Sequence, residues 1–126
     1  MTYTYDDQNI FAKILRGEIP NNTVMETDHC LAFTDIAPQA PVHVLVIPKG
    51  AYVNHDHFAT TASDAEVIDF TRTIGKICAE LDVAPGNNGH GYRLIANTGT
   101  HGVQDVPHLH VHILAGRGLG RMLTKA

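Results

Sequence analysis

The segment that decides the fold is His108-Leu109-His110-Val111-His112-Ile113-Leu114, in which polar and apolar residues alternate. Successive side chains point to opposite faces of a β-strand, so this alternation predicts a strand over 108–114. One face of that strand is apolar and packs into a core. The other face carries a row of three imidazoles about 6.5 Å apart, those of His108, His110 and His112.

Three interpretations of this histidine row are open. The first is coincidence, because a His-x-His-x-His pattern arises by chance in roughly one chain in twenty at this length and histidine content. The second is a metal site. The outer two histidines lie about 13 Å apart on a regular strand, so a shared zinc ion needs only two of the three. It also needs a further ligand such as His43, His101 or Asp105.

The third interpretation is nucleophilic and acid–base chemistry on phosphorus, and the sequence favours it. A neutral imidazole is a nucleophile near pH 7, and an imidazolium donates hydrogen bonds to phosphate oxygens. A glycine-containing turn at 98–102 and Gln104 lie just before the row, where N–H groups can face a phosphate. We therefore expect a central nucleophile with flanking donors, and neither a metal nor a cofactor.

Capping residues and apolar periodicity predict the other elements. Short strands are expected at 23–26, 30–34, 42–47 and 92–96. Residues 42–47 are apolar on both faces and should be central. Asp7 is expected to cap a short helix, and Ser63 with Glu66 forms a capping box before a long amphipathic helix. The sequence thus predicts an α+β fold in a single domain over 1–126, an antiparallel sheet of about five strands with both helices on one face.

Composition and charge exclude several classes of protein. The chain has 126 residues, of which 44% are hydrophobic and 17% are charged, which is typical of a globular protein. Thirteen acidic against nine basic residues give a net charge of −4, which disfavours nucleic acid as a partner. No apolar run is long enough to cross a membrane and no signal peptide is evident, so we expect a cytoplasmic location. Cys30 and Cys78 lie among apolar residues and should be buried thiols.

Several further blocks of the chain resemble the histidine triad (HIT) family, whose signature is His-φ-His-φ-His-φ-φ with φ an apolar residue. The blocks are 9–20, 31–36, 38–49, 92–99 and 116–123, so the likeness spans nearly the whole chain. It is closest to the Hint-type branch of nucleoside phosphoramidases. The block Gly116-Arg-Gly-Leu-Gly-Arg-Met-Leu123 is similar to bacterial members. Ordered blocks at the family's spacing are more specific than the histidine row alone.

This resemblance implies a fold and an activity. The fold is the HIT-like α+β fold, with the sheet continued across a homodimer and a purine nucleotide bound in a cleft of each subunit. The activity is hydrolysis of an adenosine 5'-phosphoramidate to AMP and an amine. His110 attacks the α-phosphorus, and water then hydrolyses the nucleotidyl-histidine. Two alternatives stay open: a dinucleoside polyphosphate hydrolase of the same family, and a non-catalytic purine nucleotide-binding scaffold.

The resemblance also assigns roles to individual residues. Those assigned to catalysis are His110, His108, His112 and His43. Those assigned to the sugar and phosphate are Asp35, Asn97 and Gln104, and Asp105 is also expected among the nucleotide-binding residues. Those expected to line the base pocket are Phe33, Ile36, Ile10, Phe11 and Ile14. Within these sets His43 is a fourth histidine beside the row, and Asp35 takes the ribose hydroxyls. His55, His57 and His90 match nothing in the family pattern and are expected at the surface.

Three positions depart from the family pattern. Ala51 stands where many members place a histidine. Val103 stands where glycine is common, and a β-branched residue disfavours positive φ, so either its dihedral angles are ordinary or the phosphate loop is altered. Asp105 stands where others have serine or an acid, and an ionised carboxylate only accepts hydrogen bonds. We expect Asp105 to accept a hydrogen bond from a protonated leaving amine or to orient a histidine such as His101; the alternative is an exposed turn acid.

Overall fold

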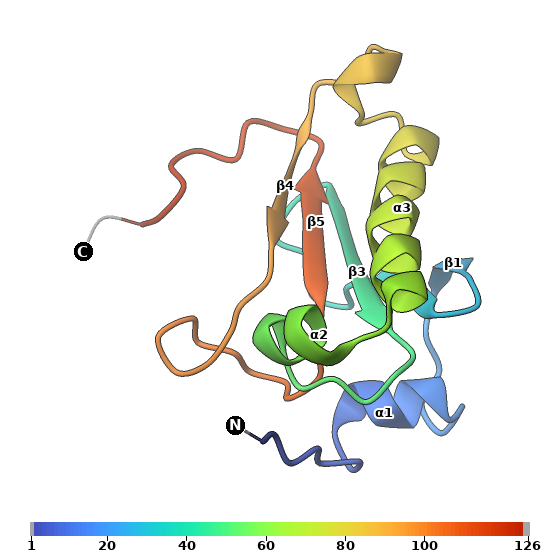
Figure 1. Cartoon of the computed structure of the whole chain (residues 1–126). Coiled ribbons are helices and arrows are strands. Elements are labelled where there is room, and N and C mark those ends of the chain that lie inside the picture. Colours follow the sequence, from blue (N-terminus) through green and yellow to red (C-terminus); the bar gives the residue numbers. More distant parts are fainter. Residues whose placement is uncertain (1, 125–126) are drawn as a thin grey trace.

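The computed structural model describes residues 2–124 and contains one five-stranded sheet with helices packed against it (Figure 1). The strands are β1 (Thr23–Glu26), β2 (Cys30–Thr34), β3 (Val42–Pro48), β4 (Tyr92–Ile95) and β5 (Val111–Ala115). All neighbours pair antiparallel, in the order β1-β2-β3-β5-β4. This arrangement confirms the predicted α+β class and the central place of β3.

Residues 2–124 contain four helical segments, one before β1 and three between β3 and β4. They are α1 (Ile10–Leu15), α2 (His55–Thr61), α3 (Asp64–Glu80) and the 3-10 helix η1 (Pro85–Asn87). The predicted capping box of α3 is present, because Ser63 and Glu66 satisfy each other's backbone N–H groups. The sequence did not predict α2, which is too short to show periodicity and has Phe58 as its one buried residue. None of these helices is long and apolar enough to span a membrane.

The prediction that Asp7 caps the first helix is wrong, because the cap is Asn9. The side-chain oxygen of Asn9 accepts hydrogen bonds from the N–H groups of Phe11 at 2.9 Å and Ala12 at 3.0 Å. The chain is still in a turn at Asp7, since the Asn9 N–H donates to the carbonyl of Asp6. A later cap therefore makes α1 shorter than the sequence pattern indicated.

Different helices cover the two faces of the sheet. Beneath α3 lies a core that includes Cys30, Ala32, Val44, Val46, Ile77, Cys78, Val111 and Ile113. Against the opposite face packs α1, in a second cluster of Phe11, Ile14, Leu31, Phe33, Leu45 and Ile47. The expectation that both helices lie on one face is therefore wrong. The physical reason is that β2 and β3 are buried on both faces, so each face needs its own cover.

The last strand begins at Val111, three residues later than predicted, and its ladder with β3 ends at the pair Val46–Val111. Pro48 closes β3 and has no N–H with which to extend the ladder. The N–H of Leu109 donates instead to the carbonyl of Tyr52 at 2.8 Å. The predicted alternation of faces nevertheless holds through this segment. Leu109 is buried in the core beneath α3, and the ring of His110 lies on the α1 side.

Both cysteines are buried thiols, as the sequence predicted. Burial raises the pKa of the Cys30 thiol to about 11, and burial also raises the pKa of Cys78. A thiol with a raised pKa is a poor nucleophile near neutral pH. The two cysteines are therefore core residues.

Candidate active site

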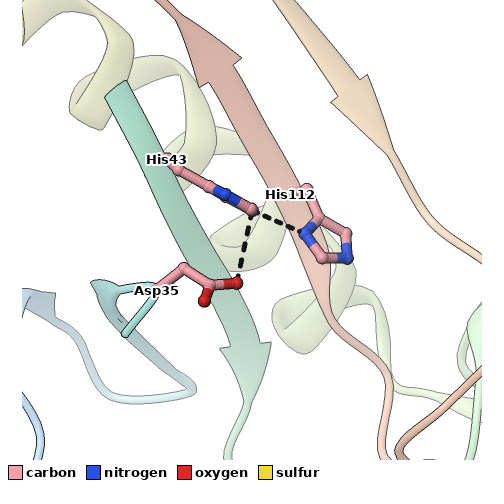
Figure 2. Close-up of side chains that lie close together, drawn as sticks. All are labelled: Asp35, His43 and His112. Atoms are coloured by element: carbon pink, nitrogen blue, oxygen red, sulfur yellow. Dashed lines mark hydrogen bonds and ion pairs between the residues drawn. The ribbon is translucent and has the colours of Figure 1, made fainter. Parts of the chain in front are cut away.

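Three neighbouring segments of the sheet bring Asp35, His43 and His112 together (Figure 2). His43 on β3 pairs with Leu114 on β5, so His112 is its diagonal neighbour on the same face. Asp35 directly follows β2, and its N–H donates to the carbonyl of His43 at 3.0 Å. The His43 Nε2 lies 2.9 Å from the His112 Nδ1 and 3.4 Å from the Asp35 Oδ2. Residues far apart in sequence thus form one side-chain trio, in which the two rings share a hydrogen bond and the Asp35 carboxylate lies close to His43.

A backbone group fixes the tautomer of His43. The N–H of Gln39 donates to the His43 Nδ1 at 3.0 Å, so the proton of the neutral ring is on Nε2. That Nε2–H points at the Nδ1 of His112, as Figure 2 shows. A neutral His112 that accepts at Nδ1 carries its own proton on Nε2. The outer nitrogen of His112 is therefore a hydrogen-bond donor.

The same trio has the spacing of a metal site, because one ligand atom from each side chain lies within 4.8 Å of the others. A histidine that binds a metal ordinarily donates its other ring N–H to an acceptor. The Nδ1 of His43 instead accepts from the Gln39 N–H, so its Nε2 has no free lone pair while the ring is neutral. The donors and acceptors suit a hydrogen bond between the His43 and His112 rings better than a shared metal ion.

His110 has one ring nitrogen that carries no proton. Its Nδ1 lies 2.8 Å from the carbonyl oxygen of His108, which can only accept, so Nδ1 carries the proton and Nε2 carries the lone pair. The ring packs edge-on against Phe11 at 4.9 Å between centroids and against His112 at 5.1 Å. An oriented imidazole with a free lone pair is what a histidine nucleophile requires.

His108 is held at both ring nitrogens and is fully buried. Its Nε2 donates to the carbonyl of Pro48 at 2.9 Å, and its Nδ1 accepts from the hydroxyl of Tyr5 at 2.6 Å. Burial lowers the pKa of His108 to about 4. Burial, together with the neighbouring imidazoles of His110 and His43, also lowers the pKa of His112 to about 4. Both flanking histidines are therefore neutral at pH 7.

These lowered pKa values predict a loss of stability in mild acid. Between about pH 6.5 and pH 4 the unfolded chain binds more protons than the folded one, so stability falls as the pH drops through that range. Each unit of pKa difference contributes about 1.4 kcal/mol. Urea unfolding at a series of pH values should show a shallower pH dependence for His108→Gln than for the wild type. His90→Gln, at an exposed position, should follow the wild type. An unchanged slope in His108→Gln would contradict the lowered pKa.

A cleft of about 450 Å³ opens between α1 and the α1-facing side of the sheet, a size that suits a small molecule. All five residues predicted for the base pocket line it: Ile10, Phe11, Ile14, Phe33 and Ile36. Asp35 and Asp105 supply carboxylates to the same cleft. Ile36 is 93% exposed, so it lies at the rim rather than in the floor. The structure thus places most of the predicted nucleotide-binding residues around one cavity.

Asp105 lies beside the expected nucleophile. Its Oδ1 is 3.5 Å from the Nε2 of His110 and also accepts a hydrogen bond from the Val106 N–H at 2.9 Å. The side chain is 78% exposed, which fits an acid at the mouth of the cleft. Within residues 2–124 the histidine that the Asp105 carboxylate approaches is His110 and not His101, the example that we named. This contact is an ion pair only when the His110 Nε2 is protonated.

Two predicted polar residues lie differently from what we expected. The side-chain amide of Gln104 donates to the carbonyls of Val53 at 2.6 Å and Val106 at 2.9 Å, so it ties the turn down rather than reaching toward a phosphate. Asn97 is half-buried just after β4. Within residues 2–124 the hydrogen bonds and ion pairs of the four site histidines do not include Asn97.

The turn before the histidine row is strained at Val103, whose φ is 54°. A non-glycine residue in this left-handed region costs about 1–2 kcal/mol. The side chain is 78% exposed, so little burial is lost on shortening it. Val103→Gly should raise the free energy of unfolding by about 1 kcal/mol, and Val103→Ala, which keeps a Cβ, should gain less. Chemical denaturation measures the free energy of unfolding of the wild type and the two variants. If Val103→Ala were more stable than Val103→Gly, the φ of residue 103 would lie in the ordinary negative range.

Sequence reasoning missed several contributors to the site. The Gln39 N–H and the Pro48 carbonyl are backbone groups, so no pattern of side chains in the sequence predicts their contacts with the histidines. Tyr5 contacts His108 across 103 residues, and only the alternation of Tyr3 and Tyr5 near the N-terminus hints at an extended arm. His57 was expected at the surface but is half-buried on α2, where its ring stacks on Tyr3 at 4.8 Å between centroids.

Comparisons with known proteins identify the family and agree with the fold. Residues 16–119 match the HIT domain family. A HIT-like protein of Azospirillum brasilense is 52% identical over 125 residues, which cover 99% of each chain. The purine nucleoside phosphoramidase of Escherichia coli K12 is 40% identical over 121 residues, covering 94% of this chain and 95% of that protein. A HIT family hydrolase from Clostridium thermocellum has a TM-score of 0.81 at 37% identity, over 94% of this chain and 99% of its own. By sequence and by fold, the chain belongs to the HIT domain family.

Proposed function

We propose that this chain is a purine nucleoside phosphoramidase, which hydrolyses adenosine 5'-phosphoramidates to AMP and an amine. The observation that carries the proposal is the unprotonated Nε2 of His110. The hydrogen bond from its Nδ1 to the His108 carbonyl orients the ring. The phosphoramidase of Escherichia coli at 40% identity supports the substrate class. The cleft is lined by Asp35 and Asp105, the acids that approach His43 and His110, and it has the size and the apolar walls that a purine needs.

The reaction proceeds in two displacements at phosphorus. The lone pair of the His110 Nε2 attacks the α-phosphorus, the bond from phosphorus to the amine nitrogen breaks, and the leaving amine takes up a proton from solvent. The product of this step is a nucleotidyl-His110, in which Nε2 is bonded to phosphorus. Water then attacks the same phosphorus, the bond to Nε2 breaks, and AMP is released. The water that attacks in this second step returns one proton to solvent. One water is consumed, and the imidazole returns to its starting state.

The neighbours of His110 suit charge development at phosphorus. The outer N–H of His112 is directed by the chain of hydrogen bonds that begins at the Gln39 N–H, so it can donate to a phosphate oxygen without reorganisation. Asp35 lies at the other end of the trio and lines the cleft, where its carboxylate can accept from the ribose hydroxyls. Phe11 and Phe33 supply aromatic surface for the base.

The test is AMP release from an adenosine phosphoramidate and from diadenosine polyphosphates, each with and without EDTA. We expect turnover of the phosphoramidate to exceed that of the polyphosphates, and EDTA to have no effect. Preference for the polyphosphates would indicate a dinucleoside polyphosphate hydrolase. AMP binding without turnover of either substrate would indicate a nucleotide-binding scaffold. Either outcome would contradict the proposed activity.

We propose further that the chain forms a homodimer through β4. This strand is at the edge of the sheet, where its unpaired backbone groups can bond to a second copy. Its side chains Tyr92 and Leu94 are 40% and 46% exposed, and Ile68 on α3 is 58% exposed. Light scattering at micromolar protein should give a dimer mass, and Leu94→Lys should shift it toward the monomer. A monomeric wild type would contradict this proposal.

A further inference from the structure

The N-terminal arm lies along the molecule and carries two tyrosines on the same side. Tyr3 and Tyr5 are half-buried, whereas Thr2 and Thr4, which alternate with them, are exposed, as expected for an extended segment with one packed face. Tyr3 stacks on His57 of α2 and donates its hydroxyl proton to Asp56. This anchor lies outside the catalytic histidines. The next packed side chain, Tyr5, reaches the histidine row itself.

The contact between Tyr5 and His108 is specific in geometry and in direction. The hydroxyl lies 2.6 Å from the Nδ1 of His108, and the two rings meet edge to face at 5.6 Å between centroids. The Nε2 of His108 already donates to the Pro48 carbonyl, so the neutral ring can only accept at Nδ1. Burial raises the pKa of the Tyr5 hydroxyl, which keeps it a donor. With His108 neutral, this placement of the hydroxyl and ring protons is the one that gives the Tyr5 hydroxyl, the His108 ring and the Pro48 carbonyl a partner each.

We propose that Tyr5 is a positioning residue for the reaction: its hydroxyl holds His108 in one tautomer and one orientation, and His108 in turn holds the nucleophile His110. The second link is the hydrogen bond of 2.8 Å from the His110 Nδ1 to the His108 carbonyl. Tyr5 contacts the ring of His108, which is itself fully buried, so it acts through His108 and not on the substrate. The catalytic consequence of this inference rests on the proposed phosphoramidase activity; the structural link from Tyr5 to His108 does not.

Without the Tyr5 hydroxyl, each of the two neutral tautomers of His108 leaves one buried polar group without a hydrogen-bond partner. In its present tautomer the buried Nδ1 has no donor, and an unsatisfied buried acceptor is costly. In the other tautomer the Pro48 carbonyl loses its donor instead. Either choice lets the ring and its carbonyl shift, and a nucleophile displaced by a fraction of an ångström reacts more slowly. The expected effect is a lower kcat, with little change in KM because no contact with the substrate is lost.

The test compares Tyr5→Phe with Tyr3→Phe. Both remove one hydroxyl from the same arm and keep the ring, but only Tyr5 touches His108. We expect Tyr5→Phe to lower kcat roughly ten-fold with KM within about two-fold, and Tyr3→Phe to change neither. In proteins labelled with 15N at histidine, the ring signals of His108 should move in Tyr5→Phe and stay fixed in Tyr3→Phe. The thermal midpoints of both variants show whether they fold.

Each outcome decides the inference. Unchanged kcat and unchanged His108 signals in Tyr5→Phe would overturn it. Equal losses of kcat in both variants, with His108 signals unmoved, would show that the arm only stabilises the fold, and would also overturn it. A wild-type protein without phosphoramidase activity would refute the proposed function alone. In that case the His108 signals still decide whether Tyr5 holds the ring.

Discussion

Replacement of His110 by asparagine should lower kcat by about four orders of magnitude, while the affinity for AMP stays within about three-fold. Asparagine offers an N–H that can still donate to the His108 carbonyl, so the neighbouring groups keep their partners. It has no ring nitrogen with a lone pair to attack phosphorus. Steady-state assays with an adenosine phosphoramidate measure kcat, and calorimetric titration with AMP measures binding.

The matched control is His101→Asn, which makes the same change at an exposed histidine of the turn before the row. This variant should keep kcat near the wild-type value. Near-normal turnover in His110→Asn would rule out the covalent role. A parallel loss of AMP binding would mean instead that the substitution disturbed the cleft, and the thermal midpoint would then show whether the fold had changed.

Replacement of Asp35 by asparagine should raise KM by about 10–100-fold, because hydrogen bonds to a charged acceptor are worth about 1.5–3 kcal/mol. The asparagine oxygen can still accept from the Ala37 N–H, which now donates to the Asp35 Oδ1 at 2.8 Å. The negative charge that would accept from the ribose hydroxyls is lost. The measurement is KM for a phosphoramidate of adenosine and for its 2',3'-dideoxy analogue.

The two substrates and the two proteins form a double-mutant cycle. If Asp35 binds the ribose hydroxyls, removing them from the substrate should raise KM strongly for the wild type and hardly at all for Asp35→Asn. Asp35 also lies 3.4 Å from the His43 Nε2, so a change in kcat alone would not separate the two roles. Equal sensitivity of both proteins to the missing hydroxyls would assign Asp35 to the histidine trio rather than to the sugar.

The sequence predicted those elements whose signals are local. β1 and β2 have the predicted bounds, and β3 and β4 differ from prediction by a single residue at one end. The capping box of α3 was readable because both of its partners lie within one helical turn. The alternation through Leu109 and Val111 correctly assigned one face to the core, even though the strand begins only at Val111.

What the sequence could not predict depends on long-range or backbone contacts. The free lone pair of His110 and the direction of the hydrogen bonds in the trio follow from carbonyl and N–H groups that any residue could supply. The contact of Tyr5 with His108 joins the two ends of the chain. Gln104 looked like a phosphate ligand, but two nearby carbonyls occupy its side-chain donors. Such competition for donors is visible only once the fold is known.

The stereochemistry at phosphorus tests the nucleotidyl-His110 intermediate most directly. The substrate is an adenosine 5'-phosphoramidothioate of a single configuration at phosphorus, hydrolysed in water enriched in 18O. Two in-line displacements, first by the Nε2 of His110 and then by water, each invert phosphorus, so the account predicts net retention of configuration. Net inversion would mean that water attacks the substrate directly. It would contradict the covalent mechanism that the unprotonated Nε2 of His110 supports.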